Sequence, residues 1–177
     1  FPVIMIIHGG CWVSSYNLSL MDSMANDLTT RGYATWNLEY RRVGNSGGGW
    51  PGTFLDIGNG LKYLVELAEI YPIDMSRILV TGHSAGGHLT LWLGAQTQLP
   101  DQSSIKVFNT PAIKGIVSLA GITDLSTYYT PSGCGGSIDD LLGGLPEEYQ
   151  SRYEEASPIA FIPLGIPQVL VNGENDG

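Results

Sequence analysis

A serine lies between two glycines in the segment Gly82-His83-Ser84-Ala85-Gly86, which has the spacing G-x-S-x-G. Serine alone is a weak nucleophile, so the pattern matters only where the chain turns sharply from a strand into a helix. Such a turn exposes the hydroxyl, and a β-carbon at either glycine would strike the neighbouring chain. A serine that merely caps a helix needs no flanking glycines. The motif predicts that Ser84 is a nucleophile for acyl transfer, with Gly82, His83 and Gly86 supporting the turn.

A second motif, HGGCW, follows an apolar run at the start of the sequence. Acyl transfer creates an oxyanion, and each preorganised N–H donor lowers that barrier by about 2.7–4 kcal/mol. Glycines let the backbone approach a substrate, so we expect the amides of Gly10, Cys11 and Ala85 to point at the oxyanion. His8 and Gly9 would support the loop. A phosphate-binding loop is the competing use of such glycines, but no lysine of the chain has the required sequence context.

A serine nucleophile also needs a histidine base, and that histidine needs an acid to hold its tautomer. Where G-x-S-x-G forms such a turn, the acid follows the serine in the chain and the histidine follows the acid. Asp176 meets this order because it comes after Ser84 and directly after an apolar run. Two rivals stay open. They are Asp124, for which ordering of its own loop is the preferred interpretation, and Glu174.

None of the three histidines of the chain suits the role of base. His83 adjoins the serine and His88 lies four residues into the following helix, so neither is well placed to reach Ser84 Oγ while an acid holds its other nitrogen. Packing and hydrogen bonding are the better interpretation of His8. We therefore expect the base beyond residue 177, and we expect the sequence to be a fragment truncated at both ends.

The elements that would position these residues alternate between apolar runs and helical spacing. Apolar runs predict strands over residues 2–7, 33–40, 77–82, 115–121 and 167–173, and helical spacing predicts helices over 18–28, 57–68 and 85–97. A poorly patterned, cap-like insert occupies residues 122–165. This alternation predicts an α/β fold, a single domain arranged as a three-layer αβα sandwich around a mostly parallel sheet. Ligands bind beyond the carboxyl ends of such strands, where all three motifs fall.

Composition and charge exclude several classes of protein. The net charge is −9 and the eight lysines and arginines form no basic cluster, so no nucleic-acid partner is expected. No apolar run reaches the roughly 18 residues of a membrane span. Cys11 and Cys134 show neither metal-ligand spacing nor a disulfide framework, and we expect no metal site. Nothing in the sequence identifies a compartment, and the cytoplasm is the default expectation.

The motifs HGGCW, GHSAGGHL and VLVNGENDG together resemble the α/β-hydrolase superfamily. The HGGxW form resembles the kynurenine formamidase (arylformamidase)-like esterases. The chain is also similar to hormone-sensitive-lipase-like carboxylesterases, in which HGGG is usual and Cys11 replaces the third glycine. The stretch NLEYRRVGNSGGGWPGTFLDI resembles bacterial proteins described only as hydrolases. The similarity covers essentially the whole chain and corresponds to the family's third to seventh strands.

This resemblance implies Ser84 as nucleophile, Asp176 as triad acid and the amides of Gly10, Cys11 and Ala85 as oxyanion donors. It implies a small-molecule substrate, either a carboxylic ester or an aryl formamide, cleaved through an acyl-enzyme without a cofactor. It also implies that the first and third predicted strands are neighbours, with the second strand on the outer side.

The pocket and the functional class stay open. Trp12, Trp50 and the insert at 122–165 are candidates to line or cover an acyl pocket, with ordinary packing as the alternative. A peptidase of the prolyl-oligopeptidase type shares this catalytic domain but needs an additional N-terminal propeller. A non-catalytic interaction protein on a hydrolase fold would usually lose the nucleophile or the oxyanion glycines, and both are present here.

Overall fold

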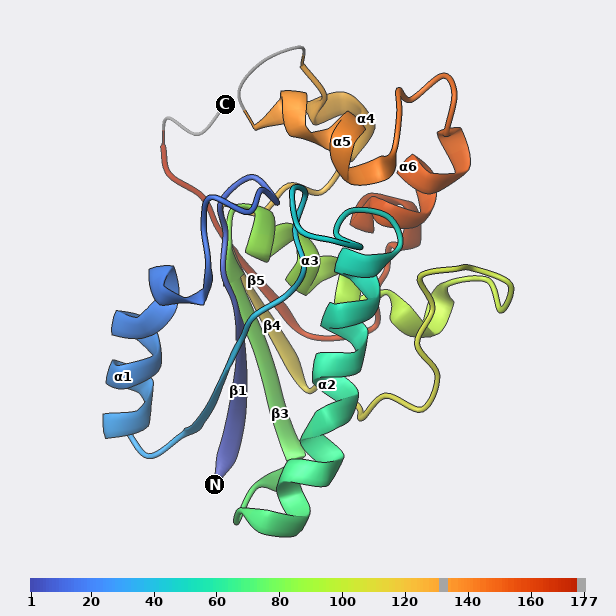
Figure 1. The fold of residues 1–177 in the computed structure, drawn as a ribbon. Coiled ribbons are helices and arrows are strands. Elements are labelled where there is room, and N and C mark those ends of the chain that lie inside the picture. Colours follow the sequence, from blue (N-terminus) through green and yellow to red (C-terminus); the bar gives the residue numbers. More distant parts are fainter. Residues whose placement is uncertain (131–133, 175–177) are drawn as a thin grey trace.

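A five-stranded parallel sheet forms the centre of the molecule (Figure 1). The computed structural model covers residues 1–177 and describes residues 1–130 and 134–174. The strands are β1 (Pro2–Ile7), β2 (Ala34–Leu38), β3 (Asp74–His83), β4 (Gly115–Leu119) and β5 (Gln168–Val171). Their order is β2-β1-β3-β4-β5, which confirms the α/β fold and the expected neighbourhood of the first and third strands.

The inner strand β1 is a continuous apolar run because both of its faces are buried. Val3, Met5 and Ile7 join one core cluster, whereas Ile4 and Ile6 join another. Alternate side chains of a strand point to opposite faces of a sheet, so the two clusters lie on its two sides. This burial explains why the first strand could be recognised to the residue.

Helices cover both faces of the sheet (Figure 1). The 3-10 turn Leu18–Met21 and helix α1 (Asp22–Thr30) cover one side, where Met21 packs under β1. Helices α2 (Gly52–Ile70) and α3 (Ala85–Gly94) contribute to the larger core on the other side. The α2 stripe predicted from the sequence is buried at its first three positions, whereas Val65 is 47% exposed. The two core clusters and the sheet between them form the expected three layers.

Three short helices of the insert lie above the carboxyl ends of the strands (Figure 1). They are α4 (Leu125–Tyr128), α5 (Ile138–Leu142) and α6 (Gln150–Ala156). Ile138, Leu141 and Tyr153 belong to the same core cluster as α2 and α3, so the insert packs onto the sheet domain. No helix among the described residues has the length and apolarity that a membrane crossing needs.

Candidate active site

The turn from β3 into α3 holds Ser84 in a backbone conformation that few residues adopt. Its φ is 54° and its ψ is −118°, outside the regions that L-residues favour. The Ser84 amide donates to the Leu119 carbonyl oxygen at 2.8 Å, which ties the turn to β4. Its side chain makes no hydrogen bond that caps α3, so the capping alternative is wrong. Strain of this kind persists only where the surroundings enforce it, and it concentrates at functional sites.

The glycines of the turn are required by close backbone contacts. A β-carbon on Gly86 would overlap the carbonyl oxygen of Ile7 and lie 2.6 Å from that of His8. A β-carbon on Gly82 would overlap Gly86 itself. The turn is therefore pressed against the loop that follows β1, as the spacing of the motif predicts.

That loop carries the HGGCW motif and lies directly beside Ser84. A β-carbon on Gly9 would lie 2.5 Å from the carbonyl oxygen of His83. Gly10 and Cys11 have φ of 106° and 52°, and within residues 1–130 and 134–174 neither amide donates to a protein acceptor. Ala85 begins α3, so its amide lacks a partner within the helix. The fold thus brings three amides without helical or sheet partners to the turn that holds the serine.

A cavity of about 890 Å³ opens beside Ser84 at the carboxyl ends of β3, β4 and β5. The wall comprises the serine turn, segment 120–124 after β4, part of the insert and Asn172 after β5. Thr127 and Tyr128 from α4 are among the polar side chains that line it. The cavity lies where parallel sheets bind ligands.

The two tryptophans proposed for the pocket lie elsewhere. Trp12 is fully buried, and its Nε1 donates to Nδ1 of His88 at 3.2 Å. Trp50 packs edge-on against Phe54 and under the guanidinium of Arg152. Neither indole lines the cavity beside the serine. The structure gives both side chains packing roles, which was the alternative considered from the sequence.

His88 is a structural histidine. Its Nδ1 accepts from Trp12, and its Nε2 donates to the carbonyl oxygen of Ala156 at 2.8 Å. Burial lowers the pKa of His88 to about 4. Both ring nitrogens are engaged, so this side chain is not available to Ser84, in agreement with the sequence interpretation.

Acidification is expected to destabilise the protein through His88. The pKa of this imidazole is about 4 in the folded state and 6.5 in the reference state. The unfolded chain therefore binds the proton more readily than the folded protein. The contribution of neutral His88 to the free energy of unfolding is fully present above pH 6.5 and is lost as pH falls toward 4. The difference corresponds to roughly 3 kcal/mol.

Denaturant unfolding of the full-length protein at about pH 7.5 and about pH 4.5 measures this loss. A His88→Gln variant keeps a side-chain donor but cannot titrate, so its free energy of unfolding should depend less on pH. An equal dependence in both proteins would contradict the assignment.

The candidate acids differ in what the structure shows of them. Asp176 lies outside the described residues, so its role stays a prediction. Asp124 accepts hydrogen bonds from the amides of Ser126 and Thr127 and from the Thr127 hydroxyl, at 3.0, 3.2 and 2.7 Å. This confirms that Asp124 orders its own loop at the start of α4. Glu174 is exposed after β5.

Cys11 and Cys134 form a disulfide that joins the HGGCW loop to the insert. Their Cα atoms are 4.9 Å apart, within the range that disulfides span. The expectation of no disulfide was wrong. The two residues are 123 positions apart, and only the fold brings both segments over the same end of the sheet. Among the described residues, no cluster of His, Cys, Asp and Glu could hold a metal ion.

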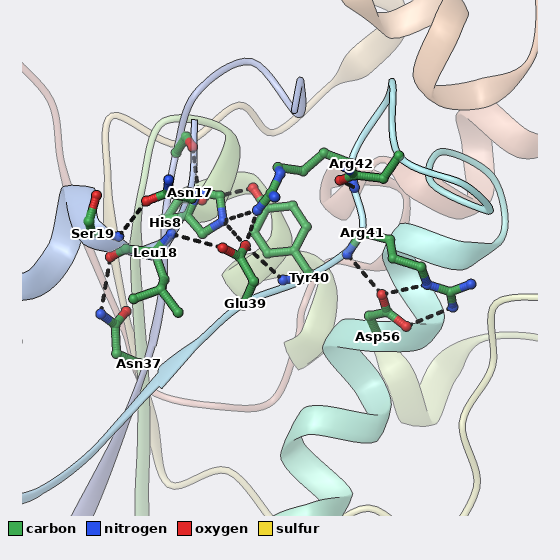
Figure 2. A network of polar contacts seen from close by, with 12 residues as sticks. His8, Asn17, Leu18, Ser19, Asn37, Glu39, Tyr40, Arg41, Arg42 and Asp56 are labelled. Carbon is green, nitrogen blue, oxygen red and sulfur yellow. Dashed lines mark hydrogen bonds and ion pairs between the residues drawn. The ribbon is translucent and has the colours of Figure 1, made fainter. Parts of the chain in front are cut away.

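Three side chains that the sequence motifs did not predict surround His8: Glu39, Tyr40 and Arg42 (Figure 2). Tyr40 stacks on the imidazole with ring centroids 4.3 Å apart and donates its hydroxyl to the His8 carbonyl oxygen. Arg42 is 8% exposed, lies 3.0 Å from the imidazole and pairs with Glu39. Burial is the largest cause that lowers the pKa of His8 to about 4. The hydrogen bond to Gly9 raises this pKa, and the charge of Arg42 lowers it. The signal that could have found them is a charged cluster directly after the strand that neighbours β1.

Comparison with known proteins identifies a family and several relatives of the chain. A family model described as BD-FAE matches residues 1–177. Esterase LipC of Mycobacterium tuberculosis is 25% identical over 181 residues, which cover 99% of this chain and 44% of LipC. The probable carboxylic ester hydrolase LipM of the same organism is 22% identical over 184 residues, covering 99% of this chain and 41% of LipM. The chain thus spans less than half the length of these two relatives.

A similar fold occurs in a solved esterase. The crystal structure of esterase B from Lactobacillus rhamnosis has a TM-score of 0.80 and 24% sequence identity. The match covers 98% of this chain and 56% of that protein. At this level of identity the likeness concerns the fold, and it agrees with the parallel sheet and flanking helices described above.

Proposed function

The chain belongs to the BD-FAE family, and from this membership we propose that the protein is a serine hydrolase that cleaves small carboxylic esters. The observation that carries the proposal is the strained Ser84 turn, which packs against a loop whose Gly10 and Cys11 amides have no acceptor among the described residues. The names of LipC and LipM describe ester hydrolysis, which supports the same reaction class.

The proposed reaction proceeds through an acyl-enzyme. Ser84 Oγ attacks the carbonyl carbon, a histidine takes the hydroxyl proton, and the same histidine then protonates the leaving alkoxide. The amides of Gly10, Cys11 and Ala85 donate to the oxyanion of each tetrahedral intermediate. Water activated by the histidine then releases the acid and restores the serine.

The base is proposed to come from outside residues 1–177. Both ring nitrogens of His8 and of His88 already have partners within the fold. His83 directly precedes the nucleophile, and the structure shows no acid that holds it among the described residues. Asp176 remains the proposed acid partner of that external histidine.

Aryl formamides are a second candidate substrate, because the HGGCW motif resembles that of the arylformamidase-like esterases. Ser84 would then carry the formyl group as a formyl-enzyme, and the same loop amides would donate to the oxyanion. Comparing kcat/KM for N-formylkynurenine with that for p-nitrophenyl acetate and butyrate distinguishes the two classes. A higher kcat/KM for N-formylkynurenine would replace the proposal of ester hydrolysis with that of aryl formamide hydrolysis.

Covalent labelling tests the nucleophile directly. The full-length protein should react with a p-nitrophenyl alkylphosphonate, release one equivalent of p-nitrophenol and lose activity toward p-nitrophenyl acetate. Peptide mass spectrometry should find the phosphonyl group on Ser84. An adduct on another residue, or absence of ester hydrolysis by the unlabelled protein, would overturn the proposal. A non-catalytic interaction protein would show neither the Ser84 adduct nor ester hydrolysis, whereas a peptidase would be identified by cleavage of a peptide p-nitroanilide.

A further inference from the structure

The His8 imidazole has three polar partners, and two of them favour a proton on Nδ1 (Figure 2). The Gly9 carbonyl oxygen, 2.7 Å from Nδ1, can only accept a hydrogen bond, so Nδ1 carries the proton. The Arg42 Nη1 group, 3.0 Å from Nε2, can only donate, so Nε2 is the acceptor. Glu39 Oε1 also lies 2.9 Å from Nε2 and can only accept, so it competes for a proton on Nε2, but the same carboxylate oxygen already pairs with the Arg42 guanidinium. Burial lowers the pKa of His8 to about 4, so the imidazole is neutral near pH 7 and its contact with Glu39 is not an ion pair there.

This tautomer controls the direction of the Gly10 amide. In a trans peptide, the carbonyl oxygen and the following N–H point in opposite directions. The Gly9 carbonyl is anchored to His8, so the Gly10 N–H points away from the imidazole. Two successive glycines impose little conformational preference of their own, and Gly10 already has a φ of 106°. The hydrogen bond from His8 therefore supplies an orientation that the loop backbone lacks.

Arg42 is placed at His8 by the sheet and by Glu39. Leu38 at the end of β2 is the register partner of Ile7 at the end of β1, so the segments that follow both strands emerge side by side. The carboxylate of Glu39 accepts from Arg42, from the Tyr40 amide at 3.1 Å and from the Leu18 amide at 3.3 Å. The guanidinium is consequently fixed before any substrate binds.

We propose that Arg42 is a positioning residue of the oxyanion loop: by donating to Nε2 it keeps the His8 proton on Nδ1, and His8 thereby aims the Gly10 amide at the oxyanion. This inference rests on the proposed ester hydrolysis. Arg42 itself does not touch the substrate. Removal of its donor leaves Nε2 facing Glu39 alone, which favours a proton on Nε2 and deprives the Gly9 carbonyl of its donor.

Kinetics of the full-length protein with p-nitrophenyl acetate test the proposal. Loss of one oxyanion donor costs about 10²–10³ in kcat, so Arg42→Met should lower kcat by roughly a hundredfold while KM changes little. The matched control is Arg41→Met. Arg41 is the adjacent arginine and pairs with Asp56 on α2, so it has no contact with His8 and its loss should leave kcat unchanged.

A rescue variant separates positioning from a merely structural role. In Glu39→Gln/Arg42→Met, the new amide can donate to Nε2 and return the proton to Nδ1 without a charge. The kcat of this double variant should be at least about tenfold higher than that of Arg42→Met, because the restored hydrogen bond to Nε2 returns part of the oxyanion stabilisation. Equal activity of the two variants, or a fall in kcat for Arg41→Met as large as for Arg42→Met, would overturn the proposal.

The His8 tautomer can be measured without activity. Nitrogen-15 NMR of the wild-type imidazole should show a protonated Nδ1 and an unprotonated Nε2 near neutral pH. A proton on Nε2 overturns the proposal even if Arg42→Met fails to fold. If the wild-type protein hydrolyses no ester but shows the Nδ1 tautomer, the proposed function fails while the contact network stands.

Discussion

Replacing Ser84 with alanine should reduce kcat of the full-length protein for a short p-nitrophenyl ester by at least about three orders of magnitude, since loss of a catalytic serine can cost roughly a millionfold. The alanine keeps the β-carbon, so the turn at φ 54° and its amide contact to Leu119 are preserved. The hydroxyl is thus removed without disturbing the core. The thermal unfolding midpoint should be unchanged, which assigns the loss to chemistry.

Ser126→Ala is a suitable control for this substitution. Ser126 is an exposed serine of α4, near the cavity wall, and only its backbone amide contributes to the Asp124 cap. Its alanine variant should keep wild-type kinetics. A Ser84→Ala variant that retains more than about a hundredth of the activity would exclude Ser84 as the nucleophile.

Breaking the Cys11–Cys134 disulfide should lower the free energy of unfolding by about 2–5 kcal/mol. The bond joins residues 123 positions apart, and cross-links that close long loops restrict the unfolded chain most. It also connects the HGGCW loop to the insert that lines the cavity. Denaturant unfolding of the full-length protein with and without reductant measures the effect.

Cys134→Ser isolates this bond from other actions of the reductant. The variant changes the insert and leaves Cys11 in its loop, so it should have the stability of the reduced wild type and respond no further to reductant. A wild-type protein whose stability is insensitive to reductant would contradict the prediction. The cytoplasmic location expected from the sequence stays a prediction.

Features that depend on a few adjacent residues could be predicted from the sequence. The G-x-S-x-G spacing predicted the strained turn at Ser84, because the glycines report where the backbone must pass close to a neighbour. The apolar run of residues 2–7 predicted β1 because burial on both faces removes any polar alternation. Strand and helix alternation then predicted the parallel sheet.

Contacts between distant segments could not be predicted in this way. The pairing of Cys11 with Cys134, the burial of Trp12 against His88 and the placement of Arg42 at His8 each join residues that belong to different elements. No local pattern encodes them, because they depend on which strands are neighbours and on where the insert packs. The sequence thus locates the strained serine turn and the glycine loop. Only the tertiary structure shows what holds that loop, because strand order alone brings the ends of β1, β2 and β3 together.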